Sequence, residues 1–200
     1  MIAKRCKRTL ITALRILLFL VGFVSAVWFF LPWREAGRFV MSAVHSQLGK
    51  MNMRVGWSDV SGEADGFTVH NLTLRGMANF SFSSMTFRPC ILASVLSFAP
   101  VSDITFSGGN VQLGAVLNLG DGGVLVTAQR SETLFENLRS DGDFAINGYM
   151  TVNLETMKIV RAEARIEKVP ETFAENMGML KNFSQLPLVE EGDGWYLRRK

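Results

Sequence analysis

The longest run of hydrophobic residues lies near the N-terminus of the chain. Residues 16–31 read ILLFLVGFVSAVWFFL without a charge, and residues 9–14 extend the run on the other side of Arg15. A helix over residues 9–31 rises about 1.5 Å per residue and covers roughly 33 Å, enough to cross the hydrocarbon core of a bilayer. The pattern therefore predicts a transmembrane anchor. Its apolar side chains are Ile16, Leu17, Leu18, Phe19, Leu20, Val21, Phe23, Val24, Val27, Trp28, Phe29, Phe30 and Leu31.

Both ends of the predicted anchor carry residues that favour a membrane interface. Arg15 lies within the first two turns, where its long side chain can reach back to the lipid headgroups. Trp28 and Trp33 flank the other end, and Pro32 provides a stop for the helix. Because positive charges stay on the cytoplasmic side, residues 1–8 are expected in the cytoplasm and the body of the chain outside it. The charges that set this orientation are Lys4, Arg5, Lys7 and Arg8.

The competing interpretation of the same segment is a cleaved signal peptide. Val24-Ser25-Ala26 places small residues where signal peptidase requires them. Against cleavage, the hydrophobic run continues through residues 27–31, so that the mature chain would begin with apolar residues. A retained anchor is the favoured prediction, and both interpretations place the remaining domain outside the cytoplasm.

The next segment, residues 32–49, has a helical period. Apolar residues recur at Ala36, Val40, Val44 and Leu48, with Phe39 and Ala43 widening the stripe, and Gly49 ends the pattern as a C-terminal cap. This predicts an amphipathic helix just outside the membrane. Its apolar face packs either on the domain or on the bilayer surface, and the domain is the commoner partner.

From Lys50 onward the period changes from about four to two, and residues 50–200 are expected to form one β-rich domain. Turn residues such as Asp65-Gly66, Gly108-Gly109, Asp121-Gly122 and Asp141-Gly142 separate the strands. This spacing leaves little room for crossover helices, so a curved and mostly antiparallel sheet is expected. Helices are expected only at residues 90–98 and 171–183. Strands are expected at residues 51–58, 67–75, 79–88, 101–106, 110–118, 123–130, 144–153 and 157–167.

Phenylalanine alternates with serine or threonine in the strand region, as at Phe80, Phe82 and Phe87. Such alternation usually means that one face of a sheet is buried in a core. The alternative is a curved sheet whose apolar face stays open as a groove for an acyl chain or a partner strand. Residues that would line this groove are Phe80, Phe82, Phe87 and Leu113.

The positive charges are concentrated at the N-terminus of the chain. The net charge is +3, but five positive charges lie within the first 15 residues, which contain no acidic residue. Removing these five from 21 Lys and Arg leaves 16 against 18 Asp and Glu, so the domain carries about −2 and nucleic acid is not an expected partner. Cys6 and Cys90 lie on opposite sides of the predicted span, so no disulfide between them is expected.

Residues capable of chemistry do not gather into a motif. His45 and His70 lack a second ligand at metal-binding spacing, and Asp59, Glu63 and Asp65 depart from the pattern of a calcium loop. No G-x-S-x-G elbow or phosphate-binding glycine loop occurs in the sequence. The sequence therefore predicts a non-enzymatic protein without a cofactor or metal.

The order of these features resembles a known family. After the anchor and the amphipathic helix come MRVGW, DVSGEADGFTVHNLTLRG, FSFSSMTFRP, the helix ILASVLSF and DITFSGGNVQLG. The chain later contains DFAINGYMTVNL, KVPETF and EEGDGWYL. This series is similar to type II secretion system protein N (GspN) and, more distantly, to AsmA-like inner-membrane proteins.

The GspN resemblance implies a single-pass inner-membrane protein with a periplasmic sheet that interacts with secretion-apparatus or envelope proteins. The AsmA-like resemblance implies a lipid-binding or lipid-transfer module with an apolar sheet groove. Neither resemblance supplies catalytic residues. The two functions therefore remain alternatives, and a lipid partner belongs only to the second.

Overall fold

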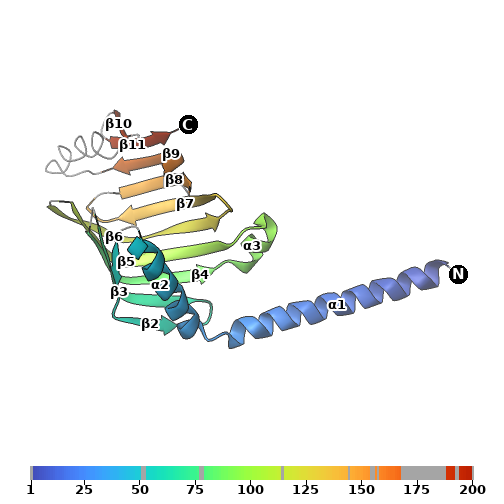
Figure 1. Cartoon of the computed structure of the whole chain (residues 1–200). Helices are drawn as coiled ribbons and strands as arrows, with labels where there is room; N and C mark the ends of the chain where they lie inside the picture. Colours follow the sequence, from blue (N-terminus) through green and yellow to red (C-terminus); the bar gives the residue numbers. More distant parts are fainter. Residues whose placement is uncertain are drawn as a thin grey trace.

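The computed structural model describes residues 2–50, 53–76, 79–113, 115–143, 145–153, 156, 158–167, 188–191 and 194–199. Within them lie three helices, α1 (Ile2–Phe30), α2 (Trp33–Lys50) and α3 (Ile91–Ser97), and one sheet of eleven strands (Figure 1). The strands are β1 (Arg54–Gly56), β2 (Asp59–Gly62), β3 (Phe67–Arg75), β4 (Asn79–Pro89), β5 (Val101–Leu113), β6 (Ala115–Ala128), β7 (Glu132–Asp141), β8 (Ala145–Asn153), β9 (Lys158–Glu167), β10 (Leu188–Glu191) and β11 (Gly194–Arg199).

From β3 to β9 the sheet is a meander in which strands that follow one another in the sequence also pair in space. Its order is β1-β3-β4-β5-β6-β7-β8-β9-β11-β10, with β2 pairing β3 beside β1, and every described pairing is antiparallel. The short connections within β3–β9 favour this arrangement, because a parallel pair needs a crossover of a dozen or more residues. The predicted fold class, mainly β with a curved antiparallel sheet and few helices, is confirmed.

Helix α2 covers one face of the sheet at its N-terminal edge, where it packs mainly on β1, β2 and β3 (Figure 1). Trp33, Gly37 and Met41, spaced by four residues, are its buried positions. The core cluster beneath it also contains Val55, Val60, Phe67, Val69, Leu72 and Phe82.

The helix differs from the sequence prediction in the position of its buried stripe. Phe39 and Val40 are 76% and 40% exposed, whereas Ala36, Val44 and Leu48 are partly buried. The packed stripe therefore runs through Trp33 and Gly37, because close approach to the sheet favours a glycine. Trp33, expected at a membrane interface, instead belongs to this core, and its ring meets that of Trp28 edge-on at 4.6 Å between centroids.

Two predicted turns are parts of continuous strands. Gly108-Gly109 forms a bulge inside β5, and Asp121-Gly122 lies inside β6, so the strands predicted at 101–106 and 110–118 were divided incorrectly. The actual β5–β6 connection lies near residue 114. The sequence prediction also missed β2, β7, β10 and β11, and the helix predicted at 171–183 lies outside the described residues.

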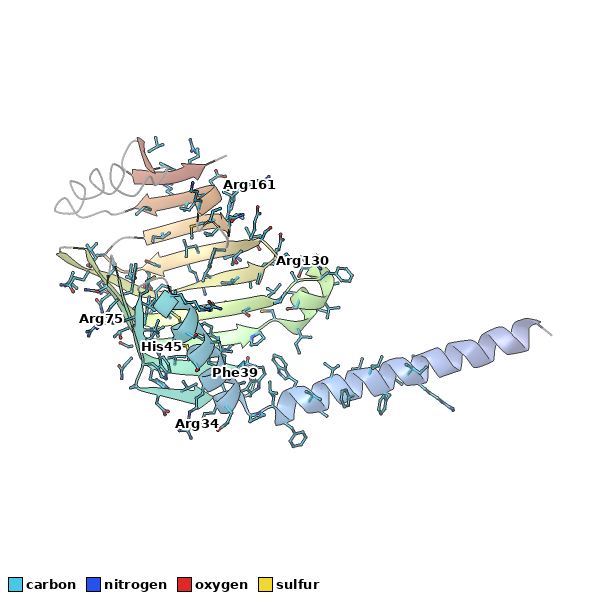
Figure 2. The ribbon with its side chains drawn as sticks, viewed as in Figure 1. Arg34, Phe39, His45, Arg75, Arg130 and Arg161 are labelled. Atoms are coloured by element: carbon cyan, nitrogen blue, oxygen red, sulfur yellow. The ribbon has the colours of Figure 1, made fainter. Side chains whose placement is uncertain are left out.

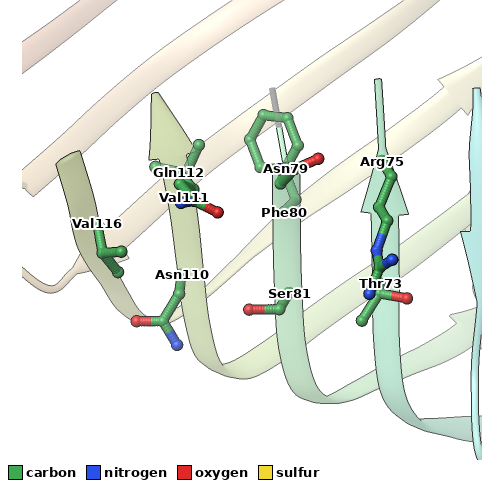
Figure 3. A pocket seen from close by; sticks show the side chains of 9 residues that line it. All are labelled: Thr73, Arg75, Asn79, Phe80, Ser81, Asn110, Val111, Gln112 and Val116. Atoms are coloured by element: carbon green, nitrogen blue, oxygen red, sulfur yellow. The ribbon is translucent and has the colours of Figure 1, made fainter. Parts of the chain in front are cut away.

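Residues with a left-handed backbone interrupt several strands in turn. They are Asn71 in β3, Gly108 in β5, Gly120 in β6 and Asn137 in β7, with φ of 51°, 57°, 66° and 53°. In β3 the residues that face the core are Phe67 and Val69 before Asn71, and Leu72 and Leu74 after it. Such bulges bend a strand and increase its twist, and Figure 3 shows the bend in the strands near these positions.

Candidate interaction surface

The four residues predicted to line a groove lie in different surroundings. Phe82 is buried in the core cluster, where its ring lies 5.3 Å from that of Phe106. Phe87 stacks on Phe67 with 4.9 Å between ring centroids, and Phe80 is partly buried against the same cluster. The side chain of Leu113 lies outside the described part of the structure. The apolar face is therefore packed where α2 covers it.

The same face continues beyond α2 toward the C-terminal strands. Residues in register point to one side of a sheet, and the row that starts at Phe106 passes through Gly122, Ser140 and Ile146 to Ile166. A neighbouring row contains Val126, Phe135, Met150 and Ala162. The side chains of both rows are buried or half-buried. Over the described strands β6–β9, however, no described helix packs on these rows as α2 does on β1–β3.

Part of the opposite face of the sheet is polar. One row in register crosses it from Thr105 through Gly123, Arg139 and Asn147 to Arg165 and Tyr196. Gly123 is tightly enclosed, because a Cβ added there would lie 3.1 Å from the Ile104 carbonyl oxygen and 3.7 Å from Nε of Arg139, which lies beside it. Three shallow hollows of about 580, 490 and 420 Å³ all include Arg139 in their walls. The Arg139 side chain is therefore the centre of the hollowed part of this face.

Charged and aromatic side chains continue the polar face over the last strands. The Arg165 Nε donates to Oε1 of Glu167 at 2.8 Å, and the guanidinium groups of Arg165 and Arg198 lie 5.7 and 5.5 Å from the ring centre of Tyr196. Arginine and tyrosine are the side chains that most often dominate protein–protein binding. We refer to Arg139, Asn147, Arg165, Tyr196 and Arg198 as the polar surface.

A separate hollow of about 350 Å³ lies where β3–β6 end (Figure 3). Thr73, Ser81 and Asn110 form one register row of its wall, and Arg75, Asn79 and Gln112 form the next. Hydroxyl, amide and guanidinium groups can bind polar ligands. No described acid–base pair in this wall has the arrangement of a catalytic site.

The two edges of the sheet differ in accessibility. At the N-terminal edge the pairing is divided between β1 and β2, and α2 lies against both. Arg34 and Arg38 of α2 reach the Asp59 carboxylate at 3.5 and 3.8 Å, and Arg34 Nε donates to the Val60 carbonyl at 3.2 Å. At the other edge, no described strand or helix pairs with the outer side of β10, and Val189 of this strand is 40% exposed. Strand β10 is therefore the open edge of the described sheet.

The Asp59 carboxylate is stabilised in its charged form. A hydrogen bond from the Val60 backbone N–H is the main cause that lowers the pKa of Asp59, and the Arg34 and Arg38 guanidinium groups lower it further against a desolvation effect. Glu63 and Asp65 of the same acidic loop pair with Arg88 at 3.4 and 3.5 Å. These carboxylates therefore hold elements together.

The histidines also have structural contacts. His45 Nδ1 lies 3.2 Å from the Val55 carbonyl oxygen, and His70 Nε2 lies 3.0 Å from the Ser61 hydroxyl. Among the described residues, no group of three His, Cys, Asp or Glu side chains is arranged to hold a metal ion.

The described side chains of α1 beyond Leu14 are almost all exposed. Phe19 and Phe23 are 71% and 57% exposed, and they stack on each other at 6.3 Å between centroids. No single helix in the described part of the chain meets both the length and the hydropathy expected of a membrane span. The pair Leu14–Trp28 and Trp33–Lys50, bent by 74°, satisfies both criteria jointly. The structure does not describe the side chains of Lys4, Arg5, Lys7, Arg8, Leu17 and Phe29.

Comparison with known proteins identifies the family. A family model described as type II secretion system protein GspN-like, Synergistales, matches residues 7–199. No curated protein and no solved structure matches the chain significantly. The match covers nearly the whole length and includes the N-terminal helix, α2 and the sheet. The chain therefore belongs to the GspN-like family of type II secretion system proteins.

Proposed function

We propose that this protein is a non-enzymatic component of a type II secretion or related envelope assembly that works by binding other proteins. The family membership supports the association with type II secretion. The observation that carries the binding role is the open edge β10, which adjoins the polar surface through β11. Together they offer unpaired backbone groups beside arginine and tyrosine side chains.

Strand addition is the binding mode that this edge favours. An extended segment of a partner can pair with the exposed backbone of β10, while its side chains contact the neighbouring surface. The edge formed by β1 and β2 is less suited to such pairing because it is divided between two short strands. A partner strand therefore adds at the C-terminal edge.

The same proposal places the chain in the inner membrane by a single span. Residues 1–8 are cytoplasmic, residues 9–31 form the anchor, residues 32–49 form the juxtamembrane helix and residues 50–200 form the periplasmic domain. The uncharged run of residues 16–31 and the exposure of its apolar side chains support the anchor. Lys4, Arg5, Lys7 and Arg8 support the orientation.

Photo-crosslinking from the open edge tests the binding role. A photoreactive phenylalanine analogue at Val189 is expected to give an adduct in cells, identified by mass spectrometry as a component of the secretion apparatus. The matched control is Val116 at the start of β6, whose side chain is 66% exposed. Equal adducts from both positions, or adducts only with unrelated envelope proteins, would count against the proposal.

The lipid-handling function remains a second candidate because of one observation. The apolar rows through Val126, Phe135, Ile146 and Met150 have no described helix over them, and a curved apolar face can bind acyl chains. Native mass spectrometry of the detergent-extracted protein checks this candidate. Lipid that co-purifies with the wild type and is lost in Phe135→Asp would favour it, whereas lipid-free protein would exclude it.

A further inference from the structure

Helix α3 is apolar on nearly every side and has no buried residue. Its described contacts are with β5, and the side chains of Leu92, Val95, Leu96 and Phe98 are 74%, 62%, 73% and 97% exposed. Soluble proteins rarely expose several large apolar side chains on one short element, and such patches usually mark an interaction site. The patch consisting of these four residues is called the α3 patch.

The α3 patch is held in a defined position. The Ser94 hydroxyl donates to the Cys90 carbonyl at 2.8 Å and accepts from the Val101 backbone N–H at 2.8 Å, which fixes the helix to the start of β5. Phe98 ends the helix in the left-handed conformation with φ of 52°, where glycine or asparagine is normal. The structure thus places a fully exposed phenyl ring at a strained backbone position.

The α3 patch lies at the same end of the sheet as the start of α2. Near the start of α2, the Arg34 backbone N lies 2.8 Å from where a Cβ on Gly62 would be. Gly62 pairs with Phe67 of β3, which in turn pairs with Phe87 of β4, close to the start of α3. Only β3 and β4 separate these points, a distance of about 10–15 Å at the usual strand spacing. In Figure 1, α1 leaves the domain toward the side on which α3 projects.

Basic side chains lie at this end of the sheet. Arg130 lies in the β6–β7 turn, which is joined to the end of α3 by a hydrogen bond from the Ala128 N–H to the Pro100 carbonyl at 2.9 Å. Arg130 and Arg161 point outward at this end in Figure 2. The acidic residues Glu63 and Asp65 at the same end are paired with Arg88, and Asp103 and Glu132 lie at the starts of β5 and β7. This end therefore carries both signs of charge, and the exposed apolar side chains of the α3 patch are what fit it to a bilayer surface.

We propose that the α3 patch inserts into the outer leaflet of the membrane that holds α1, as a second and shallow contact between the domain and the bilayer. The proposal rests on the anchor proposed above. An apolar helix face at a bilayer surface sinks about 5–10 Å into the boundary between headgroups and acyl chains. The domain is then supported at two points, so the sheet stands with α3 down and the β5–β6 hairpin away from the membrane.

Depth-dependent fluorescence quenching tests this contact in the full chain. Cys6 and Cys90 are changed to serine, and an environment-sensitive nitrobenzoxadiazole label is attached to Leu96→Cys, Phe23→Cys or Val116→Cys. The proteins are reconstituted into vesicles of phosphatidylethanolamine and phosphatidylglycerol that contain lipids with a shallow or a deep doxyl quencher. Val116 is the matched control because it is a similarly exposed apolar residue at the far end of β5–β6.

The label at residue 96 is expected to shift its emission to the blue and to be quenched mainly by the shallow doxyl group. The label at residue 23 is expected to be quenched mainly by the deep group, and that at residue 116 by neither. Adding Leu92→Glu should reduce quenching at residue 96 to the level of residue 116 and leave residue 23 unchanged.

The outcomes separate the two proposals. Quenching at residue 23 with none at residue 96 overturns the α3 contact and leaves the anchor intact. A blue shift at residue 96 without quenching by either lipid means that protein covers α3, which also overturns the bilayer contact. If residue 23 is not quenched, the anchor fails and the α3 contact with it.

Discussion

Gly37 determines how closely α2 approaches the sheet. A Cβ at this position would lie 2.6 Å from the Phe67 ring and 2.7 Å from Val60, both of which are core residues. At distances this short the Phe67 ring and the Val60 side chain would have to move. Both side chains are buried in the core and have little room to do so. The lack of a side chain at Gly37 therefore sets the distance between α2 and the sheet.

Gly37→Ala is expected to lower the free energy of unfolding by about 1–3 kcal/mol, the usual cost of overpacking a core. Chemical denaturation of the detergent-solubilised protein measures this change. Gly49→Ala, on the same helix, is the control because no atom lies within 4 Å of its added Cβ. That change should be neutral or stabilising by up to about 1 kcal/mol. Equal losses from the two substitutions would contradict the packing argument.

At the scale of elements, α2 is attached to the sheet edge by charge as well as by packing. Arg34 and Arg38 converge on Asp59 of β2, and the pKa of Asp59 lies below its ordinary value, first because of the Val60 N–H and then because of these arginines. A carboxyl group whose pKa is lowered by folding stabilises the fold above its unfolded pKa. That contribution is lost as the pH falls through the folded pKa.

Asp59→Asn is therefore expected to reduce stability by a constant amount between neutral pH and about pH 5. The difference from the wild type should shrink as the pH falls below about 4 and on through the lowered folded pKa, because the carboxyl group is protonated first in the unfolded chain and then in the folded one. Thermal unfolding monitored by circular dichroism across this range measures the difference. Glu35→Gln, on the same helix, is the control because none of the described ion pairs includes Glu35. A difference independent of pH down to the acid limit would contradict the electrostatic explanation.

Much of the sheet could be predicted from the alternation of residues. β3, β4, β8, β9 and α3 lie close to their predicted positions because their buried face alternates and turn residues bound them. Errors arose at glycines: Gly108 and Gly122 have the composition of a turn but occupy a bulge and a strand interior. Sequence alone does not separate these cases, because Gly108 is needed for its positive φ, whereas Gly122 is needed because a Cβ would clash with the Arg139 carbonyl and the Phe106 ring.

The candidate surface was harder to predict than the strands. Arg139, Arg165 and Tyr196 lie on β7, β9 and β11, and only the register of the sheet brings them into one row. Strand β7 was missed because its alternation is broken at Asn137, where φ is 53°. The α3 patch was visible as an apolar helix, but its exposure depends on the three-dimensional contacts.

At the scale of the whole molecule, the chain combines an exposed apolar helix with a two-faced sheet. One face is apolar and packed under α2, and the other carries the polar surface. The end that bears α3 also receives α1, so the proposed membrane contacts are all on one side of the domain. In the proposed arrangement, the N-terminal segment holds the domain at the membrane.

A C-terminally tagged full-length chain is expected to stay in the membrane fraction after alkaline carbonate washing. Deletion of residues 1–31 behind a cleavable export signal should move the domain toward the soluble periplasmic fraction, with residual binding only through α3. Replacement of residues 1–31 by an unrelated single span is the control and should restore membrane retention. Release of the wild type in a form about 3 kDa shorter would instead indicate cleavage after Ala26, at about 110 Da per residue for the 26 residues removed.

The unequal edges of the sheet limit how the protein can assemble. Among the described strands, one edge is divided between the short strands β1 and β2, whereas the outer side of β10 has no described partner, so strand pairing extends the sheet most readily from β10. A partner added there gives one partner for each chain, and pairing between two copies ends at a dimer because both open edges are then used. The protein would therefore terminate a β-structure in the envelope and could not propagate one.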